Sequence, residues 1–373
     1  MEGLPALRDG TRVAGGDPRV GERFRRSLTR WFRRTRRDLP WRRTNDPYRL
    51  LVAEFLLQQT RVEQARPYYQ RFLARFPDLG SLARAREGSV LKAWEGAGYY
   101  ARARNLRKLA RIVVDEHEGK LPDRVEELRE LPGVGEYTSR ALAAIAFRRP
   151  VVALDANGLR VLSRVLYPVP PTEPEVERLL GRADPRSFNE GLMELGQRLC
   201  TPRSPRCPRC PVRSVCGALA ELPDPGAVPR RGRRAPRPRV RAAVGVLVRD
   251  GRVLVQRRAP GGLLGGLWEF PGGKIETNES AAQAVCREFF EETGLPVRVL
   301  ELLGVIEHDY SHFHVSLHVF SLRRRPGGRL RGGPYRWVTA RALQRLPLPA
   351  ATRRMLPFVL PRLSAPPYRG PRA

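Results

Sequence analysis

The hydrophobic period of the chain changes once, at a segment rich in proline and arginine. Residues 221–240 read ELPDPGAVPRRGRRAPRPRV, a composition that forms no core and is typical of an extended linker. Before it, over residues 21–220, apolar residues recur every three or four positions, as in helices that bury one face. After it, over residues 241–365, RAAVGVLVRDGRVLVQRR predicts two strands around a hairpin turn. The chain is therefore expected to be multi-domain, with an all-α module and an α+β domain, preceded by a disordered segment, residues 1–20.

The net charge of the chain points to a polyanionic partner. The 373 residues include 69 lysines and arginines against 38 aspartates and glutamates, a net charge of +31. Such an excess attracts polyanions, and nucleic acid is the expected partner. The sequence has no run of about eighteen apolar residues, so no membrane span is expected. The N-terminus MEGLPALRDG lacks the apolar core of a signal peptide, which favours a cytoplasmic location, nucleoid-associated in a bacterium.

Four of the five cysteines lie in the short stretch CTPRSPRCPRCPVRSVC, with the spacing C-x6-C-x2-C-x5-C. In a reducing compartment, cysteines this close are more often metal ligands than disulfide partners. A zinc ribbon would supply two C-x2-C pairs, whereas this stretch has one. The spacing therefore favours a [4Fe-4S] cluster, with zinc as the alternative. The ligands would be Cys200, Cys207, Cys210 and Cys216, and the arginines between them would give the loop a DNA-contacting surface.

A glycine turn precedes one of the expected helices. The stretch LPGVGEYTSRALAAIAF, residues 131–147, places Gly133, Val134 and Gly135 before an apolar-periodic segment. Glycines let the backbone approach an anion, and the free N–H groups at a helix start can bind a phosphate oxygen. A tight turn between two packed helices is the alternative interpretation.

These motifs carry a resemblance to a known family. LPGVG with its helix, VALDANGLRVLSR and the cysteine loop resemble the helix-hairpin-helix DNA glycosylases of the endonuclease III superfamily. LPWRRTNDPYRLLVAEFLLQQTRV (39–62) and WEGAGYYARARNL (94–106) narrow the resemblance to the adenine DNA glycosylases, the MutY family, over residues 25–362. It implies a monomeric base-excision-repair enzyme that acts on double-stranded DNA containing adenine opposite 8-oxoguanine or guanine.

Two acids are the expected catalytic groups. Cleaving a purine from its sugar requires a proton for the leaving base and stabilisation of an oxocarbenium-like sugar. Glu54 lies in the apolar run LLVAEFLLQQT, where burial would raise its pKa and keep a proton available. Asp155 follows the apolar VVAL, and the resemblance implies that it faces the sugar. The alternative roles are a surface position for Glu54 and a helix N-cap for Asp155.

The reaction is expected to stop at base removal. Superfamily members that also cut the strand carry a lysine where this chain has Tyr137, and no lysine lies between Lys120 and Lys274. An amine nucleophile for a Schiff base is therefore absent from this region, which favours a monofunctional glycosylase.

The resemblance implies further site residues. Tyr137 and Asn157 would support the reacting centre, and Arg42 would contact the extruded adenine. Gln59 and Tyr99 match positions that wedge the duplex when a base leaves the stack; helix-surface and core positions are their alternatives. The chain departs from the family in having Ala97 in place of the usual leucine and Ala156 where glycine is frequent.

The C-terminal part contains a complete Nudix box. GGLWEFPGGKIETNESAAQAVCREFFEETGL matches G-x5-E-x7-R-E-U-x-E-E-x-G-U. Glu288, Glu291 and Glu292 fall at i, i+3 and i+4, so they share one helix face and are candidate Mg²⁺ ligands. The corresponding domain of the MutY family resembles the MutT nucleotide hydrolase, usually lacks these acids and recognises 8-oxoguanine. In that role, Ser311 and His312 match its lesion-reading loop; an ordinary hairpin is the alternative.

The box leaves further functions open. The chain would be a Nudix hydrolase of oxidised nucleoside triphosphates tethered to DNA, or a bifunctional protein with both activities. A non-catalytic mismatch binder would need neither Glu54 nor Asp155, and both are present. A glycosylase for pyrimidine lesions is disfavoured by Tyr137 and by the appended domain.

Overall fold

The computed structural model describes residues 18–229, 236–259, 261–262, 264–310 and 313–364. These residues form two compact units, and neither is continuous in sequence. The first contains the described residues up to Tyr69, Asp78–Gly80, and those from Lys108 up to the linker; the second contains Gln70–Pro77, Ser81–Arg107 and those after the linker. The segment Ser81–Arg107 therefore packs with the C-terminal part of the chain.

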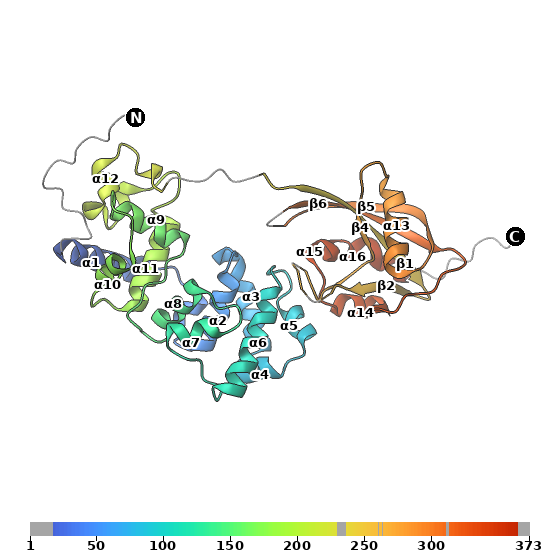
Figure 1. Ribbon diagram of the computed structural model, residues 1–373, viewed down its shortest axis with the longest axis horizontal. Helices are drawn as coiled ribbons and strands as arrows, with labels where there is room; N and C mark the ends of the chain where they lie inside the picture. Colours follow the sequence, from blue (N-terminus) through green and yellow to red (C-terminus); the bar gives the residue numbers. More distant parts are fainter. Residues whose placement is uncertain (1–17, 230–235, 260, 263, 311–312, 365–373) are drawn as a thin grey trace. The chain divides into compact units, whose positions relative to one another are not determined.

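The first unit is built of helices, as the three-and-four spacing of apolar residues predicts (Figure 1). Its helices are α1 (Pro18–Thr35), η1 (Pro40–Arg43), α2 (Pro47–Leu57), α7 (Val125–Glu130), α8 (Glu136–Ile145), α9 (Ala156–Val165), α10 (Glu173–Leu180), α11 (Pro185–Arg198), η2 (Cys207–Arg209), η3 (Arg213–Val215), α12 (Gly217–Glu221) and η4 (Pro225–Ala227). Three more, α3 (Val62–Arg75), α4 (Leu79–Arg84) and α6 (Ala101–Glu116), contribute residues to both units, and α5 (Glu87–Ala93) belongs to the second.

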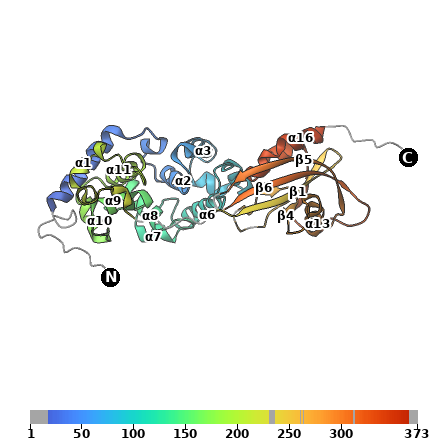
Figure 2. The same cartoon turned by 90° about the horizontal axis from the view of Figure 1, so that it is seen from above.

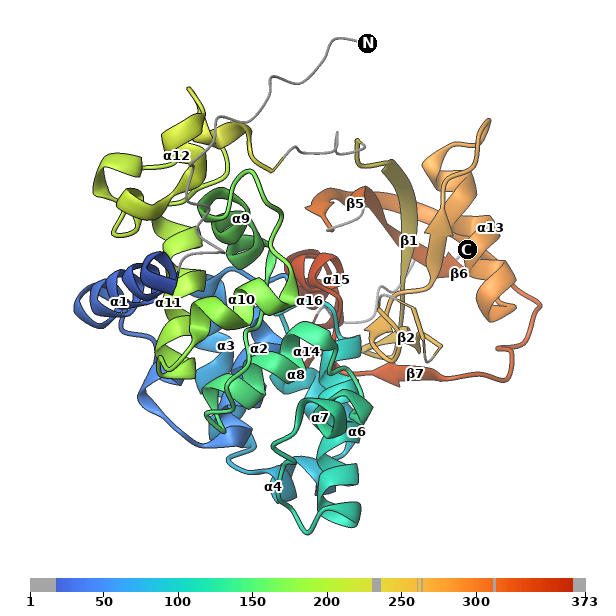
Figure 3. The same cartoon turned by 60° about the vertical axis from the view of Figure 1, so that its left-hand side comes forward.

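The core of the first unit lies where α1 packs on α11 (Figure 3). Phe24 of α1 meets Phe188 of α11 edge to face, with ring centroids 6.0 Å apart. Gly191 lets the two helices approach closely, because a Cβ there would lie 3.2 Å from Cβ of Phe32. Further along α11, Glu190 and Glu194 reach the site described below. The packing of α1 on α11 therefore fixes the helix that supplies these two acids.

The second unit is organised around a mixed sheet. Its strands are β1 (Arg239–Arg249), β2 (Arg252–Arg257), β3 (Trp268–Glu269), β4 (Gly272–Lys274), β5 (Val297–Asp309), β6 (His314–Arg324) and β7 (Tyr335–Val338). The order is β3-β2-β1-β6-β5, with β4 also paired to β1 and β7 to β2. The β1–β6 pair is parallel and the other pairs are antiparallel.

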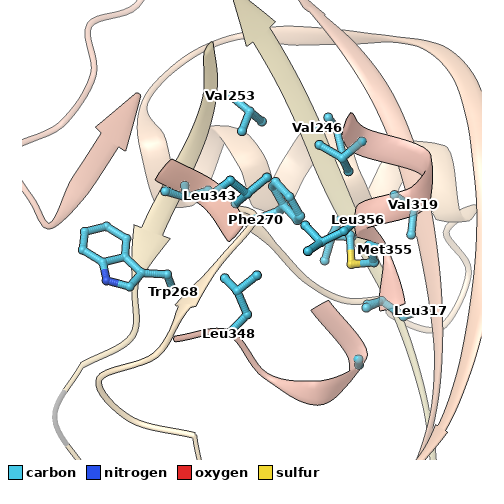
Figure 4. Packing of buried hydrophobic residues seen from close by; sticks show 14 of the residues in the cluster. Val246, Val253, Trp268, Phe270, Leu317, Val319, Leu343, Leu348, Met355 and Leu356 are labelled. Atoms are coloured by element: carbon cyan, nitrogen blue, oxygen red, sulfur yellow. The ribbon is translucent and has the colours of Figure 1, made fainter. Parts of the chain in front are cut away.

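Helices cover both faces of this sheet, as Figure 2 shows. They are α13 (Ala281–Thr293), α14 (Ala340–Arg345), α15 (Ala350–Arg354) and α16 (Leu356–Ser364). Because side chains alternate along a strand, Ala243 and Leu247 of β1 pack with α13, whereas Val244 and Val246 pack in the opposite cluster, with Met355 and the C-terminal helices (Figure 4). The predicted α+β domain is thus confirmed.

Local signals explain several boundaries. The predicted hairpin joins β1 to β2 through Asp250 and Gly251, whose φ values of 49° and 67° suit a tight hairpin turn. A capping box of Ser280 and Gln283 starts α13, and left-handed Gly294 ends it.

The predicted linker and the predicted disordered start overlap ordered elements at their edges. The first helix begins at Pro18, within residues 1–20, and residues 1–17 lie outside the described part. Within the linker, η4 and the first residues of β1 are formed, and residues 230–235 lie outside the described part. Among the described residues, none of the helices has the combined length and apolar character needed to cross a bilayer.

Candidate active site

Both predicted catalytic acids open into one pocket of the first unit. The pocket has a volume of about 710 Å³. Six of the residues singled out from the sequence line it: Arg42, Glu54, Gln59, Tyr137, Asp155 and Asn157. They come from η1, α2, α8 and α9 and from the loop after α2, so the fold joins segments more than a hundred residues apart in sequence. The pocket has room for an extruded base.

Glu54 lies in a strongly apolar setting. Its neighbours on α2, Ala53 and Phe55, are buried, as are most residues of that helix. Among the described residues, none donates a hydrogen bond or forms an ion pair with the Glu54 carboxyl group. Burial, followed by the charges of Glu190 and Asp155, raises the pKa of Glu54 to about 8. The carboxyl group therefore keeps its proton at neutral pH.

Asp155 differs from Glu54 in that hydrogen bonds hold both of its carboxyl oxygens. It is the N-cap of α9, where one carboxylate oxygen accepts from the Gly158 N–H at 2.6 Å. The other oxygen accepts from Nδ2 of Asn157 at 2.7 Å. Asn157 is fixed in turn, because its Oδ1 accepts a hydrogen bond from Arg160. The backbone of Gly196 packs against it, since a Cβ on Gly196 would lie 2.7 Å from the Cβ of Asn157. Asp155 therefore caps α9, and its carboxyl group also lines the pocket.

Tyr137 enters the pocket between the two acids as a neutral group. Burial, together with the charges of Glu54 and Asp155, raises the pKa of Tyr137 well above its ordinary value. Its hydroxyl group donates to Sδ of Met193 at 3.0 Å. Tyr137 thus adds a neutral phenol to the lining of the pocket.

Arginines and glutamates form a network along one wall. Arg37 and Arg42 both bind Glu194, with Nη2 to Oε2 distances of 2.8 and 3.0 Å. Burial alone would raise the pKa of Glu194, but the hydrogen bonds and charges of the two arginines lower it to about 2. Arg186 binds Glu190 at 3.2 Å, yet burial still raises the pKa of Glu190.

Glu190 and Glu194 are functional candidates that the sequence reasoning missed. Glu190 lines the pocket beside the predicted residues, and Glu194 anchors Arg42. Their spacing of four on the otherwise apolar helix FNEGLMELG was the available signal, because it places two acids on one buried face.

The two residues predicted to wedge the duplex share an unusual backbone. Gln59 has φ 61° and Tyr99 has φ 48°, values that non-glycine residues rarely adopt. Such conformations concentrate at functional sites. Gln59 lines the pocket, whereas Tyr99 belongs to the second unit and its ring lies 5.4 Å from the guanidinium of Arg102.

The remaining predicted DNA-contacting residues lie elsewhere. Gly133, Val134 and Gly135 join α7 to α8 and do not line the pocket. Gly133 has φ 82°, and Gly135 is the N-cap of α8, so the glycine turn before a helix is present as predicted. Ser311 and His312 lie outside the described residues.

The four predicted cluster ligands are brought to one place. Cys200, Cys207, Cys210 and Cys216 line a single small pocket together with apolar side chains, and each is a free thiol. Buried Arg164 braces the loop, since its Nη1 lies 3.3 Å from Sγ of Cys200 and donates to the carbonyl of Thr201 at 2.8 Å. The chemistry of these donors, soft thiols in an apolar setting, suits an iron–sulfur cluster, although the described thiols do not stand close enough together to form a metal-binding group.

The Nudix acids are arranged unequally in the second unit. Glu288 and Glu292 line a pocket of about 900 Å³, and Glu291 does not. Glu292 accepts from the Gly272 N–H at 2.9 Å and from Gln256 at 2.7 Å. Glu269 of β3, which the sequence reasoning missed, completes the acidic lining.

Arg287 forms ion pairs with several acids of the Nudix box. It pairs with Glu279 at 2.6 Å and with Glu288 and Glu291 at 3.1 Å each. A Cβ at Gly273 would overlap the Glu288 carboxyl group, so a larger residue there would displace that side chain. Within the described residues, no three His, Cys, Asp or Glu side chains stand close enough to form a metal-binding group, at the box or at the cysteine loop.

Comparison with known proteins identifies the family. The model described as "HhH-GPD superfamily base excision DNA repair protein" matches residues 52–185, and the model described as "NUDIX domain" matches residues 243–357. The adenine DNA glycosylase of Rattus norvegicus is 34% identical over 361 residues, which cover 80% of this chain and 70% of that protein. The chain belongs to the adenine DNA glycosylase family. The resemblance inferred from the sequence is thereby confirmed.

Other adenine DNA glycosylases and one solved structure extend the comparison. The human adenine DNA glycosylase is 33% identical over 363 residues, covering 80% of this chain and 66% of that protein. The structure titled a thermostable thymine-DNA glycosylase is 29% identical, has a TM-score of 0.51 and covers 55% of this chain and all of its own. That likeness supports the predicted glycosylase fold of the helical part.

Proposed function

We propose that this chain is a monofunctional DNA glycosylase that hydrolyses the N-glycosidic bond of adenine paired with 8-oxoguanine or guanine. The observation that carries the proposal is a protonated Glu54 and a hydrogen-bonded Asp155 lining one pocket of about 710 Å³. Family membership supports adenine as the base. The enzyme is proposed to act as a monomer on double-stranded DNA, since all six pocket residues come from one chain.

Glu54 is proposed as the general acid. A purine leaves its sugar more easily when it has gained a proton, and Glu54 still carries one at neutral pH because burial raises its pKa to about 8. The absence of a described hydrogen-bond donor to its carboxyl group leaves that proton free to move to the base. The neutral Tyr137 beside it adds no competing charge.

Asp155 is proposed to stabilise the sugar cation that remains. The Gly158 N–H and the Asn157 amide bind its two oxygens, so the group is oriented before the substrate arrives. A fixed negative charge costs no reorganisation when positive charge develops on the sugar. Water then completes the hydrolysis, because the pocket lining contains no lysine that could form a Schiff base.

Base recognition is assigned to the wall of charged residues. Arg42 is held by Glu194 at 3.0 Å and presents its guanidinium at the pocket, and Glu190 adds a carboxyl group there. Such groups can donate to and accept from the edge of an extruded purine. Gln59 and Tyr99, with their strained backbones, are the proposed wedge residues.

The cysteine loop is proposed to hold a [4Fe-4S] cluster. Cys200, Cys207, Cys210 and Cys216 would be its ligands, and the cluster would cross-link the loop and so fix its exposed arginines toward DNA. Iron and acid-labile sulfide in the purified protein, both reduced by Cys207→Ser, are the expected result. Zinc without sulfide would support the alternative metal.

The substrate is tested by single-turnover excision on duplexes with adenine opposite 8-oxoguanine, guanine or thymine, with and without alkali. Strand breaks that require alkali and are fastest opposite 8-oxoguanine or guanine are expected. An oxidised-pyrimidine duplex serves as the control. Alkali-independent cutting of that duplex would contradict both the base and the monofunctional chemistry.

A second activity is favoured by one observation on the Nudix box. Glu288, Glu292 and Glu269 line the same pocket of about 900 Å³, and burial raises the pKa of Glu292 beside the other two charges. The described carboxylates do not stand close enough to form a metal-binding group by themselves. We propose that they bind Mg²⁺ together with the phosphates of an oxidised nucleoside triphosphate. Carboxylate oxygens are the ligands that Mg²⁺ prefers.

Release of pyrophosphate or phosphate from 8-oxo-dGTP, dependent on Mg²⁺, tests this activity. Glu288→Gln should abolish it, whereas Glu291→Gln, at a carboxylate outside the pocket, should reduce it less. Equal turnover by the wild type and Glu288→Gln would mean that the Nudix box has only a structural role.

A further inference from the structure

The first helix of the described chain carries arginines along one side. Phe24, Leu28 and Phe32 of α1 are buried toward α11. On the opposite side stand four arginines spaced by three, four and three residues, which helical geometry places in one row. This row, called the arginine face below, consists of Arg23, Arg26, Arg30 and Arg33. It is about 15 Å long.

The arginine face has no compensating charge among the described residues. All four side chains are exposed, and none forms an ion pair with a described carboxylate. Glu22 is the only acid on the helix. Some other exposed arginines of the same unit are paired, such as Arg148 with Asp184 at 2.8 Å. Like charges spaced by three or four residues destabilise a helix, so an anionic partner would relieve the repulsion.

A DNA backbone fits this surface. Phosphates rise by about 3.4 Å per nucleotide along one strand, so a row of this length can meet several of them. The planar guanidinium forks bind phosphate in pairs of hydrogen bonds. The row itself contains no apolar side chain of the kind that an interfacial membrane helix would bury.

The basic surface continues into the cysteine loop. A shallow hollow of about 260 Å³ at the edge of the row is lined by Arg30, Trp31 and Arg34 of α1 and by Pro211 of the loop. The loop adds its own exposed arginines, among them Arg213. Both features lie in the first unit, so the row borders the loop whose arginines are proposed to face the DNA at the pocket.

The arginine face is turned away from the active-site wall. The buried side of α1 packs on α11, the helix that supplies Glu190 to the pocket. The arginine face lies on the other side of α1, so a duplex whose base fills the pocket leaves this row open to another duplex.

We propose that the arginine face binds the backbone of a second duplex segment while the pocket side holds the first. The enzyme then passes directly from one DNA segment to another without first dissociating. This inference rests on the proposed function, because it requires a DNA duplex at the pocket.

Competitor-dependent dissociation tests the proposal. The enzyme is bound to a labelled undamaged duplex, and release is followed by fluorescence anisotropy while unlabelled duplex is added at rising concentration. For the wild type, the dissociation rate should rise with competitor concentration, since a ternary complex forms. In the variant Arg23→Gln, Arg26→Gln, Arg30→Gln, Arg33→Gln, that dependence should be lost while single-turnover excision stays within twofold of the wild type.

Two further variants separate the effect of position from those of charge and folding. Arg252→Gln, Arg298→Gln, Arg323→Gln and Arg341→Gln together remove the same charge from exposed positions of the second unit, and should keep the competitor dependence. Replacing the four arginines of the arginine face by lysine should restore most of it. Circular dichroism confirms that the glutamine variant is folded.

Three outcomes would overturn the proposal. They are a wild-type dissociation rate independent of competitor, unchanged transfer in the glutamine variant, and a parallel loss of excision, which would place the arginine face on the first duplex. Failure of the proposed function is a separate result, because the wild type would then release no adenine from any duplex.

Discussion

Glu54 of the first unit and Glu279 of the second show opposite pKa shifts, because their neighbours differ. In the first unit Glu54 has no described hydrogen-bond donor, and burial raises its pKa to about 8. In the second unit Arg287 binds Glu279, Glu288 and Glu291 and lowers the pKa of Glu279. Burial raises the pKa of Glu54, whereas the hydrogen bonds of Arg287 lower that of Glu279. The neighbours of a glutamate, more than its identity, decide which chemistry it can perform.

The contrast recurs beside the first pocket, whose wall residue Arg42 binds Glu194. Glu194, between Arg37 and Arg42, has its pKa lowered to about 2, whereas that of Glu54 is raised. Arg37 and Arg42, which would lower the pKa of Glu54 if they bound it, thus bind Glu194 instead. Separating the pKa values of neighbouring acids assigns their roles in catalysis.

Replacing the proton carrier should have the largest effect. Glu54→Gln keeps the size of the side chain but removes the proton, so single-turnover adenine excision should fall by about 10³-fold. Glu288→Gln, the matched change in the other pocket, should leave excision unchanged. Equal losses in the two variants would mean that the change disturbs the whole chain.

Replacing the fixed anion should cost less. Asp155→Asn retains an oxygen that can cap α9, so we expect thermal unfolding to shift by only a few degrees. Excision should still fall by about 10²-fold, because the fixed charge facing the sugar is lost. Full activity of the folded variant would leave Asp155 as a helix cap alone.

The raised pKa of Glu54 should also lower the free energy of unfolding at high pH. Because the pKa of Glu54 is raised in the folded state, the folded protein binds more protons than the unfolded chain between pH 4.5 and about 8. Stability from this group is present below that range and is lost as the pH rises through it. At pH 8, Glu54→Gln should therefore unfold at a higher denaturant concentration than the wild type. Its free energy of unfolding should be larger by at least ~1 kcal/mol. A gain of the same size at pH 4 would point to another cause.

Replacing Arg287, which binds several acids of the Nudix box, should have the smallest effect. Arg287→Gln removes four ion pairs whose side chains reach the solvent in part, and such pairs contribute about 1 kcal/mol or less each to the free energy of unfolding. Thermal melts at low and high salt should differ little, and adenine excision should match the wild type. A large loss of excision would contradict independent roles for the two acidic pockets.

The sequence predicted the architecture and most of the first pocket. The change in hydrophobic period at residues 221–240 separated the helical from the mixed part, and both are confirmed. Glu54 was singled out because it lies in an apolar run and matches a motif of the family, whereas the run alone left a surface position open. The cysteine spacing likewise singled out the four thiols that line one pocket.

Features that depend on tertiary packing were not visible. Glu190 and Glu194 read as ordinary helix residues until α11 is packed against α1 and Arg42 is brought to it. Glu291 belongs to the Nudix pattern, but its place on the helix turns it away from the pocket, and Glu269 enters from a strand instead. Sequence spacing gives the face of one element, whereas a site is made by several.

The most direct test of the central claim is the pH dependence of single-turnover adenine excision from a duplex with adenine opposite 8-oxoguanine. If Glu54 is the proton carrier, the rate should be high at neutral pH and fall tenfold per pH unit above about 8. Glu54→Gln should show a low rate without that decline. A wild-type rate that falls above pH 5, or that stays constant to pH 9, would contradict the account.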